Sequence, residues 1–287
     1  MNYITKYILY YIIEFMNQMI NKIYPPSKKK LYKASTLYLN PLLSKVYKQN
    51  RPLYYANFLT SFDGRIATYD KKNSCLLTPQ SIKSSVDFSL FCQLHAQSDC
   101  LVTNTQYIKG LNKGYYGNIL TVNNDTLKRW RNKNGIKKQE IIILSNSLDF
   151  PINNKILDLK DRITILTTSK NNKKINNFKK NGFKLTKFRG KNISANQLNK
   201  YILKNNFKAV YFIAGPTIVE QMINSNLLDK LYSSTSISMM GTQKYDTIIR
   251  GNFLKNPIDI ELIEMYIYTE HVKKRQTLFQ VFNTKRK

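Results

Sequence analysis

The chain has 287 residues, a length that allows one large domain or one domain with an extension. Hydrophobic residues make up 42% and aromatic residues 12%, which is enough apolar material for a packed core and excludes wholesale disorder. Its 46 Lys and Arg against 17 Asp and Glu give a formal charge of +29. Three cysteines, none in a CxxC pair, and two histidines exclude a disulfide scaffold and offer no zinc spacing. We therefore expect no metal and a reduced, cytoplasmic setting.

A charge of +29 first points to nucleic acid as a partner. The excess is mostly Lys, however, whereas Arg is the residue that reads bases and clamps phosphates with two hydrogen bonds. The chain is also rich in Asn, Ile and Tyr, so the Lys content fits a general drift in composition. Nucleic acid is therefore not the expected partner, although a basic nucleic-acid-binding protein stays open as an alternative.

Residues 1–24 are apolar and rich in Tyr, and no uninterrupted apolar run in them reaches the roughly 20 residues of a membrane span. Apolar side chains recur at helical spacing, namely Ile4, Ile8, Ile12, Phe15 and Met19. This spacing predicts an amphipathic helix that docks on the body of the protein or on a partner subunit, with attachment to a membrane surface as the lesser alternative. Pro25-Pro26 ends the helix. The predicted organisation is a helical extension and linker over 1–50 and one domain over 51–287.

From residue 53 onwards, short apolar segments alternate with helical ones. Strands are predicted at 53–59, 100–103, 141–144, 163–167, 183–188 and 210–213. Helices are predicted at 79–97, 176–180, 195–203 and 215–224, and extended segments at 230–238, 258–268 and 277–282. This order predicts an α/β fold, in which a mostly parallel central sheet has helices on both faces and antiparallel C-terminal strands at one edge.

In such sheets ligands bind outside the carboxyl ends of the strands. Four junctions place polar or glycine residues there: 57–67, 74–79, 101–105 and 213–218. The last of them passes through Gly215 into a helix N-terminus, where backbone N–H groups and the helix dipole suit a phosphate. Each junction also has a plain structural explanation, such as an Asp-Gly turn or a helix cap formed by Thr78 before Pro79.

Several expected signatures are absent from the sequence. It contains no G-x-G-x-x-G, no G-x-x-x-x-G-K-[ST], no G-x-S-x-G and no H-E-x-x-H. His95 lies within a predicted helix, where a lone histidine is more often structural. Cys75 and Cys100 have no neighbouring base in the sequence, so a thiolate nucleophile is unsupported.

Taken in order, the junctions carry a resemblance to one family. Residues 57–67, NFLTSFDGRIA, are similar to an A-x-S-L-D-G-[RK]-I-A segment, and Ser74–Thr78 is similar to S-x-W-I-T. Further similar segments are 96–103, 141–151, 213–217, 227–231 and 239–241. Together they resemble the RibD C-terminal domain, the pyrimidine reductase of riboflavin biosynthesis, over roughly 53–283.

The resemblance implies a dihydrofolate-reductase-like fold, which agrees with the order of segments, and a homodimer. It implies an oxidoreductase that uses NADPH to reduce a ribosylamino-pyrimidine phosphate, as a 5-amino-6-(5-phosphoribosylamino)uracil reductase does. Hydride would pass from nicotinamide C4 to the sugar C1 in its ring-opened imine form. The task of the protein would then be orientation and the exclusion of water, because the cofactor carries the chemistry.

By the same resemblance, two sets of residues form the binding site. The residues implied to hold the cofactor are Thr103, Asn104, Ser145, Thr167, Ala214, Gly215, Pro216, Thr217 and Ile218. The residues implied to face the substrate or the nicotinamide are Asn57, Ser61, Ser74, Leu77 and Thr78. Asp63 is the implied catalytic residue, with a role in hydrogen bonding and positioning.

The chain also departs from the family pattern. Leu76 stands where the family has a stacking Trp, and Ile213 stands where it has the Glu of E-G-G. Ala214 replaces the first Gly of that motif, and His95 replaces an Arg. These positions help to define the substrate, so a different heterocyclic substrate or a family member without activity stays open as an alternative.

Overall fold

The structure is a computed structural model that describes residues 18–40, 42–43, 51–136, 138–250, 257–270 and 274–284. The chain divides into two compact units, which are described separately. Unit 1 combines residues 1–42, 57–94 and 230–287, and unit 2 combines residues 43–56 and 95–229. The first four residues of strand β3 (Leu53–Ser61) belong to unit 2, and its other residues belong to unit 1.

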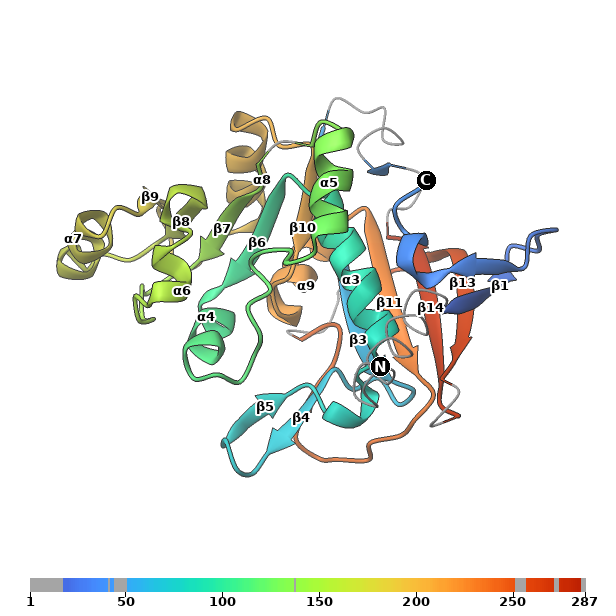
Figure 1. The fold of residues 1–287 in the computed structure, drawn as a ribbon. Helices are drawn as coiled ribbons and strands as arrows, with labels where there is room; N and C mark the ends of the chain where they lie inside the picture. Colours follow the sequence, from blue (N-terminus) through green and yellow to red (C-terminus); the bar gives the residue numbers. More distant parts are fainter. Residues whose placement is uncertain are drawn as a thin grey trace, which may run out of the picture. The chain divides into compact units, whose positions relative to one another are not determined.

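Unit 2 contains a parallel run of sheet in the order β3-β10-β6-β7-β8-β9 (Figure 1). The strands that follow β3 are β6 (Cys100–Asn104), β7 (Glu140–Leu144), β8 (Ile163–Thr167), β9 (Lys184–Lys187) and β10 (Ala209–Phe212). The central residues of β6, β7, β8 and β10 are almost fully buried, with Leu101, Ile143, Ile165 and Tyr211 at 0% exposure. Burial on both faces explains why these four strands are mostly apolar without alternation, whereas the last strand β9 is partly exposed and carries two Lys.

Five of the six helices named here in unit 2 begin at a polar side-chain cap, and four of these caps are Asn. The six helices are α4 (Thr105–Asn112), α5 (Asp125–Lys133), α6 (Asn154–Leu157), α7 (Asn172–Lys180), α8 (Ala195–Lys204) and α9 (Pro216–Asn224). The side chains of Asn104, Asn124, Asn153 and Asn171 each accept a backbone N–H of the first turn of the helix that follows. Ser194 forms a capping box with Gln197 at α8. Such caps stabilise a helix by about 1 kcal/mol each.

Asp229 anchors the beginning of β3 within unit 2. Its buried carboxylate accepts two hydrogen bonds from the guanidinium of Arg51, at 2.6 and 3.1 Å, and one from the backbone N–H of Tyr54 at 2.8 Å. The Asp229 N–H in turn donates to the Tyr54 carbonyl. A buried carboxylate is tolerated only when it is paired and hydrogen-bonded in this way.

Unit 1 contains an antiparallel run of sheet in the order β2-β1-β13-β14-β11, followed by β3. Its strands are β1 (Met19–Tyr24), β2 (Leu31–Lys33), β11 (Lys230–Ser236), β13 (Glu261–Thr269) and β14 (Gln276–Asn283). A small second sheet joins β4 (Ala67–Asp70), β5 (Cys75–Leu77) and β12 (Tyr245–Asp246). Helix α3 (Ser85–Gln97) begins in this unit.

The predicted α/β fold is confirmed, with parallel strands and helices in unit 2 and late antiparallel strands in unit 1. The predicted helix over residues 1–24 is wrong for Met19–Tyr24, which forms strand β1 and pairs with β13. Residues 1–17 lie outside the described residues. Pairing with a neighbouring strand has overridden the helical spacing, because such spacing is a weak signal beside tertiary contacts.

The predicted helix start at Pro79 is also wrong. Gln80–Ile82 forms a short 3₁₀ turn without a side-chain cap, and α3 begins only at Ser85. The Ser84 hydroxyl, not that of Thr78, accepts the N–H of Asp87 in the first turn of α3. A continuous helix from Pro79 is excluded because Lys83 has extended backbone angles, with φ −67° and ψ 141°.

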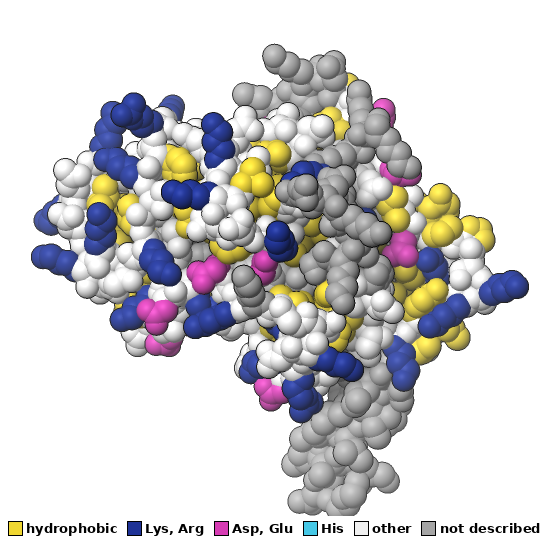
Figure 2. All heavy atoms as spheres, turned by 90° about the horizontal axis from the view of Figure 1, so that it is seen from above, with side chains coloured by type: hydrophobic (Ala, Val, Ile, Leu, Met, Phe, Trp, Pro, Cys, Tyr) yellow, Lys and Arg dark blue, Asp and Glu magenta, His cyan; other side chains and the backbone are white. Residues whose placement is uncertain are grey.

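Lys and Arg side chains dominate one face of the protein (Figure 2), and the described residues contain neither a membrane-spanning helix nor a group of metal ligands. Figure 2 shows one face of the molecule, on which Lys and Arg side chains greatly outnumber Asp and Glu. In the described part of the chain, no helix is both long and apolar enough to cross a membrane. The same residues contain no group of three His, Cys, Asp or Glu side chains that could hold a metal ion.

Asp87 in the first turn of α3 is a partly buried acid. Its Oδ1 is shielded from solvent and has no hydrogen-bond partner among the described residues, and Ser234 of β11 hydrogen-bonds to the carboxyl group. Burial raises the pKa of Asp87 to about 6. The native state therefore favours the protonated acid, and this contribution to stability is lost as the pH rises from about 4 through about 6.

We expect Asp87→Asn to stabilise the protein at pH 7 by on the order of 2 kcal/mol, because the amide keeps a hydrogen-bonding group and carries no charge to bury. Urea unfolding at pH 4.5 and pH 7.5 checks this, and the gain is expected to shrink at the lower pH. Asp125→Asn is the control, because that carboxylate is 83% exposed beside Lys128. A gain at Asp87 that is equal at both pH values would contradict the assignment.

Candidate functional site

The candidate residues fall into two sets that belong to different units. The residues implied to hold a cofactor lie in unit 2, and those implied to face a substrate lie in unit 1. In unit 2, Thr103 and Asn104 end β6, Ser145 follows β7, Thr167 ends β8, and residues 214–218 follow β10. The strand registers bring these ends to one edge, since Asn104 is opposite Leu144 and Phe212 is opposite Val102.

The N-terminus of α9 differs from the capped helices of unit 2. Its N-cap is Gly215, which provides no side-chain hydrogen bond, and Pro216 is the first helical residue. The φ angle of Gly215 is −66°, so any residue could adopt this backbone conformation. A Cβ atom there would lie 3.6 Å from Asn104 Nδ2, which is ordinary contact. The uncapped N–H groups and the helix dipole favour an anion.

Thr103 provides an independent observation at this edge. Its side chain is fully buried, and its Oγ1 has no hydrogen-bond partner among the described residues. An unpaired buried hydroxyl costs about 1–3 kcal/mol, so such a group calls for an explanation. Thr103 comes one residue before Asn104, whose Nδ2 lies against Gly215. The Thr103 hydroxyl is therefore an unsatisfied polar group near the carboxyl end of β6 among the described residues.

The other polar residues of this edge already have local partners. The Asn104 side chain caps α4 by accepting the N–H of Tyr107 at 3.0 Å. Ser145 Oγ accepts the N–H of Leu148 at 3.0 Å, and Thr167 Oγ1 accepts the N–H of Ser169 at 3.0 Å. These three side chains therefore shape the loops that follow their strands.

In unit 1, Asp63 joins two loops. Its Oδ1 accepts the hydroxyl of Ser61 at 2.5 Å, and its Oδ2 accepts the backbone N–H groups of Met240 and Gly241, both at 3.0 Å. Arg65 forms an ion pair with the same carboxylate. The turn after β3 is thereby fastened to residues 240–241, which no sequence spacing could indicate.

These contacts decide the charge of Asp63. The hydrogen bond from Ser61, those from Gly241 and Met240, and the nearby Arg65 lower its pKa to about 2. The carboxylate is therefore ionised throughout the neutral range and carries no proton to donate. Its geometry is that of a group that positions a loop.

Arg65 is also part of the contacts around Asp63, although the family resemblance does not assign it to the site. Its guanidinium donates to the carbonyls of Asp63 and Thr242 and stacks on the ring of Tyr245 at 4.4 Å. Its Nε is buried without a partner among the described residues. In the sequence, the Asp-Gly-Arg segment indicates this ion pair, because an Arg that closely follows an acidic turn residue can fold back and pair with its carboxylate.

The other residues of unit 1 that are implied to face the substrate do not all lie close to one another. Leu77 lies on β5 opposite Thr68, and Thr78 follows it, at the end of the hairpin that leads back to Arg65. Ser74 lies at the other end of β5, in the exposed hairpin turn, at a distance on the order of 10 Å along the strand. Asn57 lies half-buried on β3. Ser74 and Thr78 therefore cannot hold the same small group.

His95 of α3 has the structural role that the sequence analysis favours. It is 1% exposed, and its ring nitrogens face the carbonyl of Ile119 at 3.0 Å and the amide of Gln139 at 3.4 Å. Burial lowers the pKa of His95 to about 3, so the ring is neutral. Its ring is therefore unavailable to a ligand at the surface.

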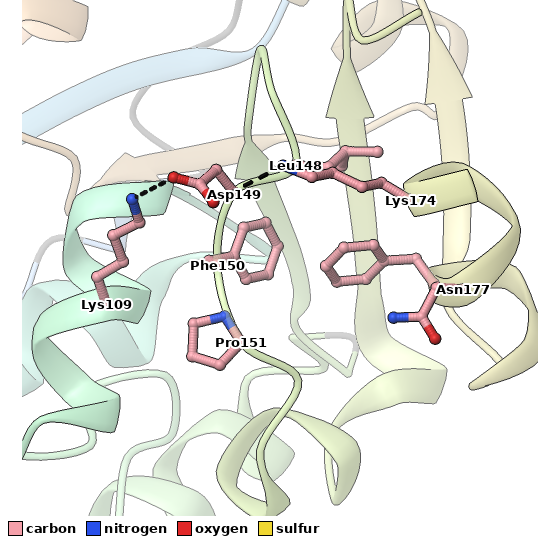
Figure 3. Close-up of a pocket in the computed structure, with 8 residues that line it drawn as sticks. Lys109, Leu148, Asp149, Phe150, Pro151, Lys174 and Asn177 are labelled. Atoms are coloured by element: carbon pink, nitrogen blue, oxygen red, sulfur yellow. Dashed lines mark hydrogen bonds and ion pairs between the residues drawn. The ribbon is translucent and has the colours of Figure 1, made fainter. Parts of the chain in front are cut away.

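One cavity of about 290 Å³ lies in unit 2 between the loop after β7 and helix α7 (Figure 3). Phe150 and Phe178 form part of its wall, with ring centroids 4.8 Å apart. At its rim, Asp149 pairs with Lys109 at 2.8 Å and with Lys174 at 3.7 Å. The cavity contains none of the predicted site residues, and its charges are already paired.

The sequence of the chain matches one family model, described as the RibD C-terminal domain, over residues 52–273. A search of curated proteins finds no match. Among solved structures, the fold is similar to a pyrimidine reductase-like protein of Corynebacterium diphtheriae, with a TM-score of 0.69 and 16% identity. That similarity covers 88% of this chain and 99% of the other.

Two further structures share the fold. RibD of Acinetobacter baumannii has a TM-score of 0.59 and 14% identity, over 85% of this chain and 61% of that protein. The riboflavin biosynthesis reductase Rib7 of Saccharomyces cerevisiae has a TM-score of 0.53 and 12% identity, over 86% of this chain and 98% of that one. At such low identities these similarities concern the fold alone.

We expect Asp63→Ala to release the loop at residues 240–241, because two backbone N–H groups lose their acceptor. Amide hydrogen exchange of Met240 and Gly241 is expected to accelerate at least tenfold. Asp70→Ala is the matched control, since Asp70 holds only its own turn through Asn73. Unchanged exchange at both amides in the Asp63 variant would refute the role of this carboxylate.

Proposed function

The chain belongs to the RibD C-terminal domain family, and on that premise we propose that it is an NADPH-dependent pyrimidine reductase. The proposed substrate is 5-amino-6-(5-phosphoribosylamino)uracil, and the proposed domain is 51–287. In unit 1, strands β1 and β2 from the preceding segment extend the sheet of that domain. The homodimer expected from the resemblance stays a prediction.

The observation that carries the proposal is the edge formed by Thr103 and the N-terminus of α9. A helix start without a side-chain cap offers N–H groups to an anion, and a buried hydroxyl nearby lacks a partner among the described residues. Both features fit a phosphorylated cofactor. Bound NADPH would supply a hydride to C1 of the ring-opened sugar.

The unit 2 residues would bind and orient the cofactor. Residues 214–218 would take a phosphate at the helix start, beside the carboxyl end of β6 with Thr103. Asn104, Ser145 and Thr167 would contribute mainly by fixing the loops that bound the site, since their side chains already have local partners. A rigid binding edge reduces the entropy lost when the cofactor is ordered.

The unit 1 residues would act on the substrate side. Asp63 and Ser61 would hold the loop after β3 in position, with the Ser61 hydrogen bond as the main contact that keeps the carboxylate charged and Arg65 as its ion-pair partner. Leu77 and Thr78 would contact the substrate, and the position of Ser74 in the hairpin turn makes it the weakest candidate of the set. Asp63 would act as a positioning residue because its pKa leaves it without a proton at neutral pH.

A second candidate is a family reductase for another heterocycle. The position at which the family has an Arg is His95 here, and that ring is neutral and 1% exposed. A cationic contact to an anionic substrate is therefore missing at this place. The same observation is compatible with a family member that binds the cofactor and lacks the named activity.

The test of the function is an NADPH titration followed by turnover with the ribosylamino-pyrimidine phosphate. We expect saturable quenching of protein fluorescence with a Kd in the micromolar range that is usual for substrates and cofactors, and oxidation of NADPH at 340 nm only when the substrate is present. Binding without turnover would reject this substrate and favour the second candidate. No binding even at millimolar NADPH would reject the oxidoreductase.

We expect Gly215→Asp to weaken NADPH binding at least a hundredfold, because a carboxylate at the helix start repels a phosphate. Gly215→Ala is the matched control and is expected to change the Kd less than about threefold, since the added Cβ meets Asn104 Nδ2 only at 3.6 Å and the φ of −66° suits alanine. Melting temperatures verify that both variants fold. Equal affinities for the two variants would contradict the phosphate position.

A further inference from the structure

Positive charge is distributed unevenly along the chain. The whole chain has one Asp or Glu for about every 17 residues, yet residues 162–219 contain none. The same 58 residues contain 13 Lys and Arg. A drift in composition raises the Lys content everywhere, but it does not remove every acid from one stretch. The stretch therefore needs an explanation beyond the total charge.

The structure gathers much of this charge at the outer end of the unit 2 sheet, which we name the basic edge. It comprises the exposed side chains Lys170, Lys173, Lys179, Lys180, Lys184, Lys187, Arg189 and Lys191. They belong to α7, to the last strand β9 and to the loops around them. Figure 2 shows Lys and Arg side chains gathered toward the end of the unit at which Figure 1 draws α7 and β9.

The basic edge is not neutralised by the protein. None of its eight side chains forms an ion pair with a described carboxylate. Lys174 of α7, which is not part of the basic edge, pairs with Asp149. Like charges that lie close together repel one another, and an external anion relieves that repulsion. The edge therefore favours an anionic partner, more so at low salt.

The shape of the basic edge selects a polymer over a small molecule. The cavity beside α7 is lined by Lys174, Asn177 and Phe178 of that helix and by none of the eight side chains of the edge. Small ligands bind in concave sites with converging polar groups. A row of exposed cations suits a chain of phosphates instead, and the nine residues of α7 alone extend over about 13 Å.

The surroundings of the basic edge distinguish between polyanions. Among the described residues from 89 to 202, no large hydrophobic side chain is exposed. The edge therefore lacks the apolar anchors of a membrane-binding surface. It also offers no exposed aromatic platform on which single-stranded bases stack, because Phe178 and Phe183 are buried and Phe188 is half-buried. With seven Lys and one Arg, it can contact phosphates but is poorly suited to read base edges.

We propose that the basic edge binds the phosphate backbone of double-stranded nucleic acid independently of sequence. Such binding rests on the release of counterions, so its affinity falls steeply with salt and its Kd at physiological salt is of order 10⁻⁴ to 10⁻⁶ M. The proposal is independent of the reductase function, because none of the eight side chains belongs to the candidate cofactor or substrate sets.

The test uses the full chain and a fluorescent 20-base-pair duplex of mixed sequence, with fluorescence anisotropy recorded between 50 and 200 mM salt. The variant replaces Lys173, Lys179, Lys180 and Lys184 with Gln and keeps Lys187, which lies opposite the cofactor candidate Thr167. The control replaces Lys28, Lys30, Lys71 and Lys72 with Gln, which are exposed residues of unit 1 and remove the same charge. The melting temperature and the NADPH affinity are measured for the variant and for the control. We expect neither quantity to change in either protein.

We expect the edge variant to weaken duplex binding at least tenfold at 100 mM salt and to reduce the slope of log K against log salt by about 2 to 3. The control is expected to change the Kd less than about threefold. Should the quadruple variant fail to fold, Lys173→Gln with Lys184→Gln is expected to give about half of the slope change. Equal losses in variant and control would overturn the proposal, as would tighter binding to a single strand or to vesicles of anionic lipid than to the duplex.

Discussion

Burial of the parallel strands on both faces is the constraint on which the rest of the structure depends. Strands β10, β6, β7 and β8 have no solvent face, so most of their interior positions are apolar, and the polar exception, Thr164 of β8, is hydrogen-bonded with Tyr201. The other polar residues of these strands lie near the strand ends. Thr103, Asn104, Ser145 and Thr167 therefore gather at one edge for a steric and solvation reason, before any ligand is considered.

Most polar side chains at the helix starts of unit 2 form hydrogen bonds within the protein. Asparagine caps four helices of unit 2, and a serine caps a fifth, so their first N–H groups are satisfied internally. Helix α9 is the exception, and the buried hydroxyl of Thr103 is a second one. Departures from local satisfaction are informative because a protein tolerates them where a ligand completes the contact.

Charge acts differently in the two units. In unit 1, a single carboxylate organises two loops because Asp63 receives three hydrogen bonds and an ion pair. In unit 2, positive side chains accumulate along α7 and β9 without acids between them. The total charge of +29 conceals this contrast. Location and pairing, not the total, decide what a charged residue can bind.

The sequence by itself determined the α/β class, the family and the buried strands β6, β7, β8 and β10, because buried strands leave apolar runs and the turn residues after them form ordered motifs. Only the tertiary structure decided that Met19–Tyr24 is a strand, because pairing with β13 outweighs a helical spacing. It also decided that Asp63 lies against Gly241 and that Thr103 lacks a partner among the described residues. Such facts depend on contacts between distant segments, which local patterns do not encode.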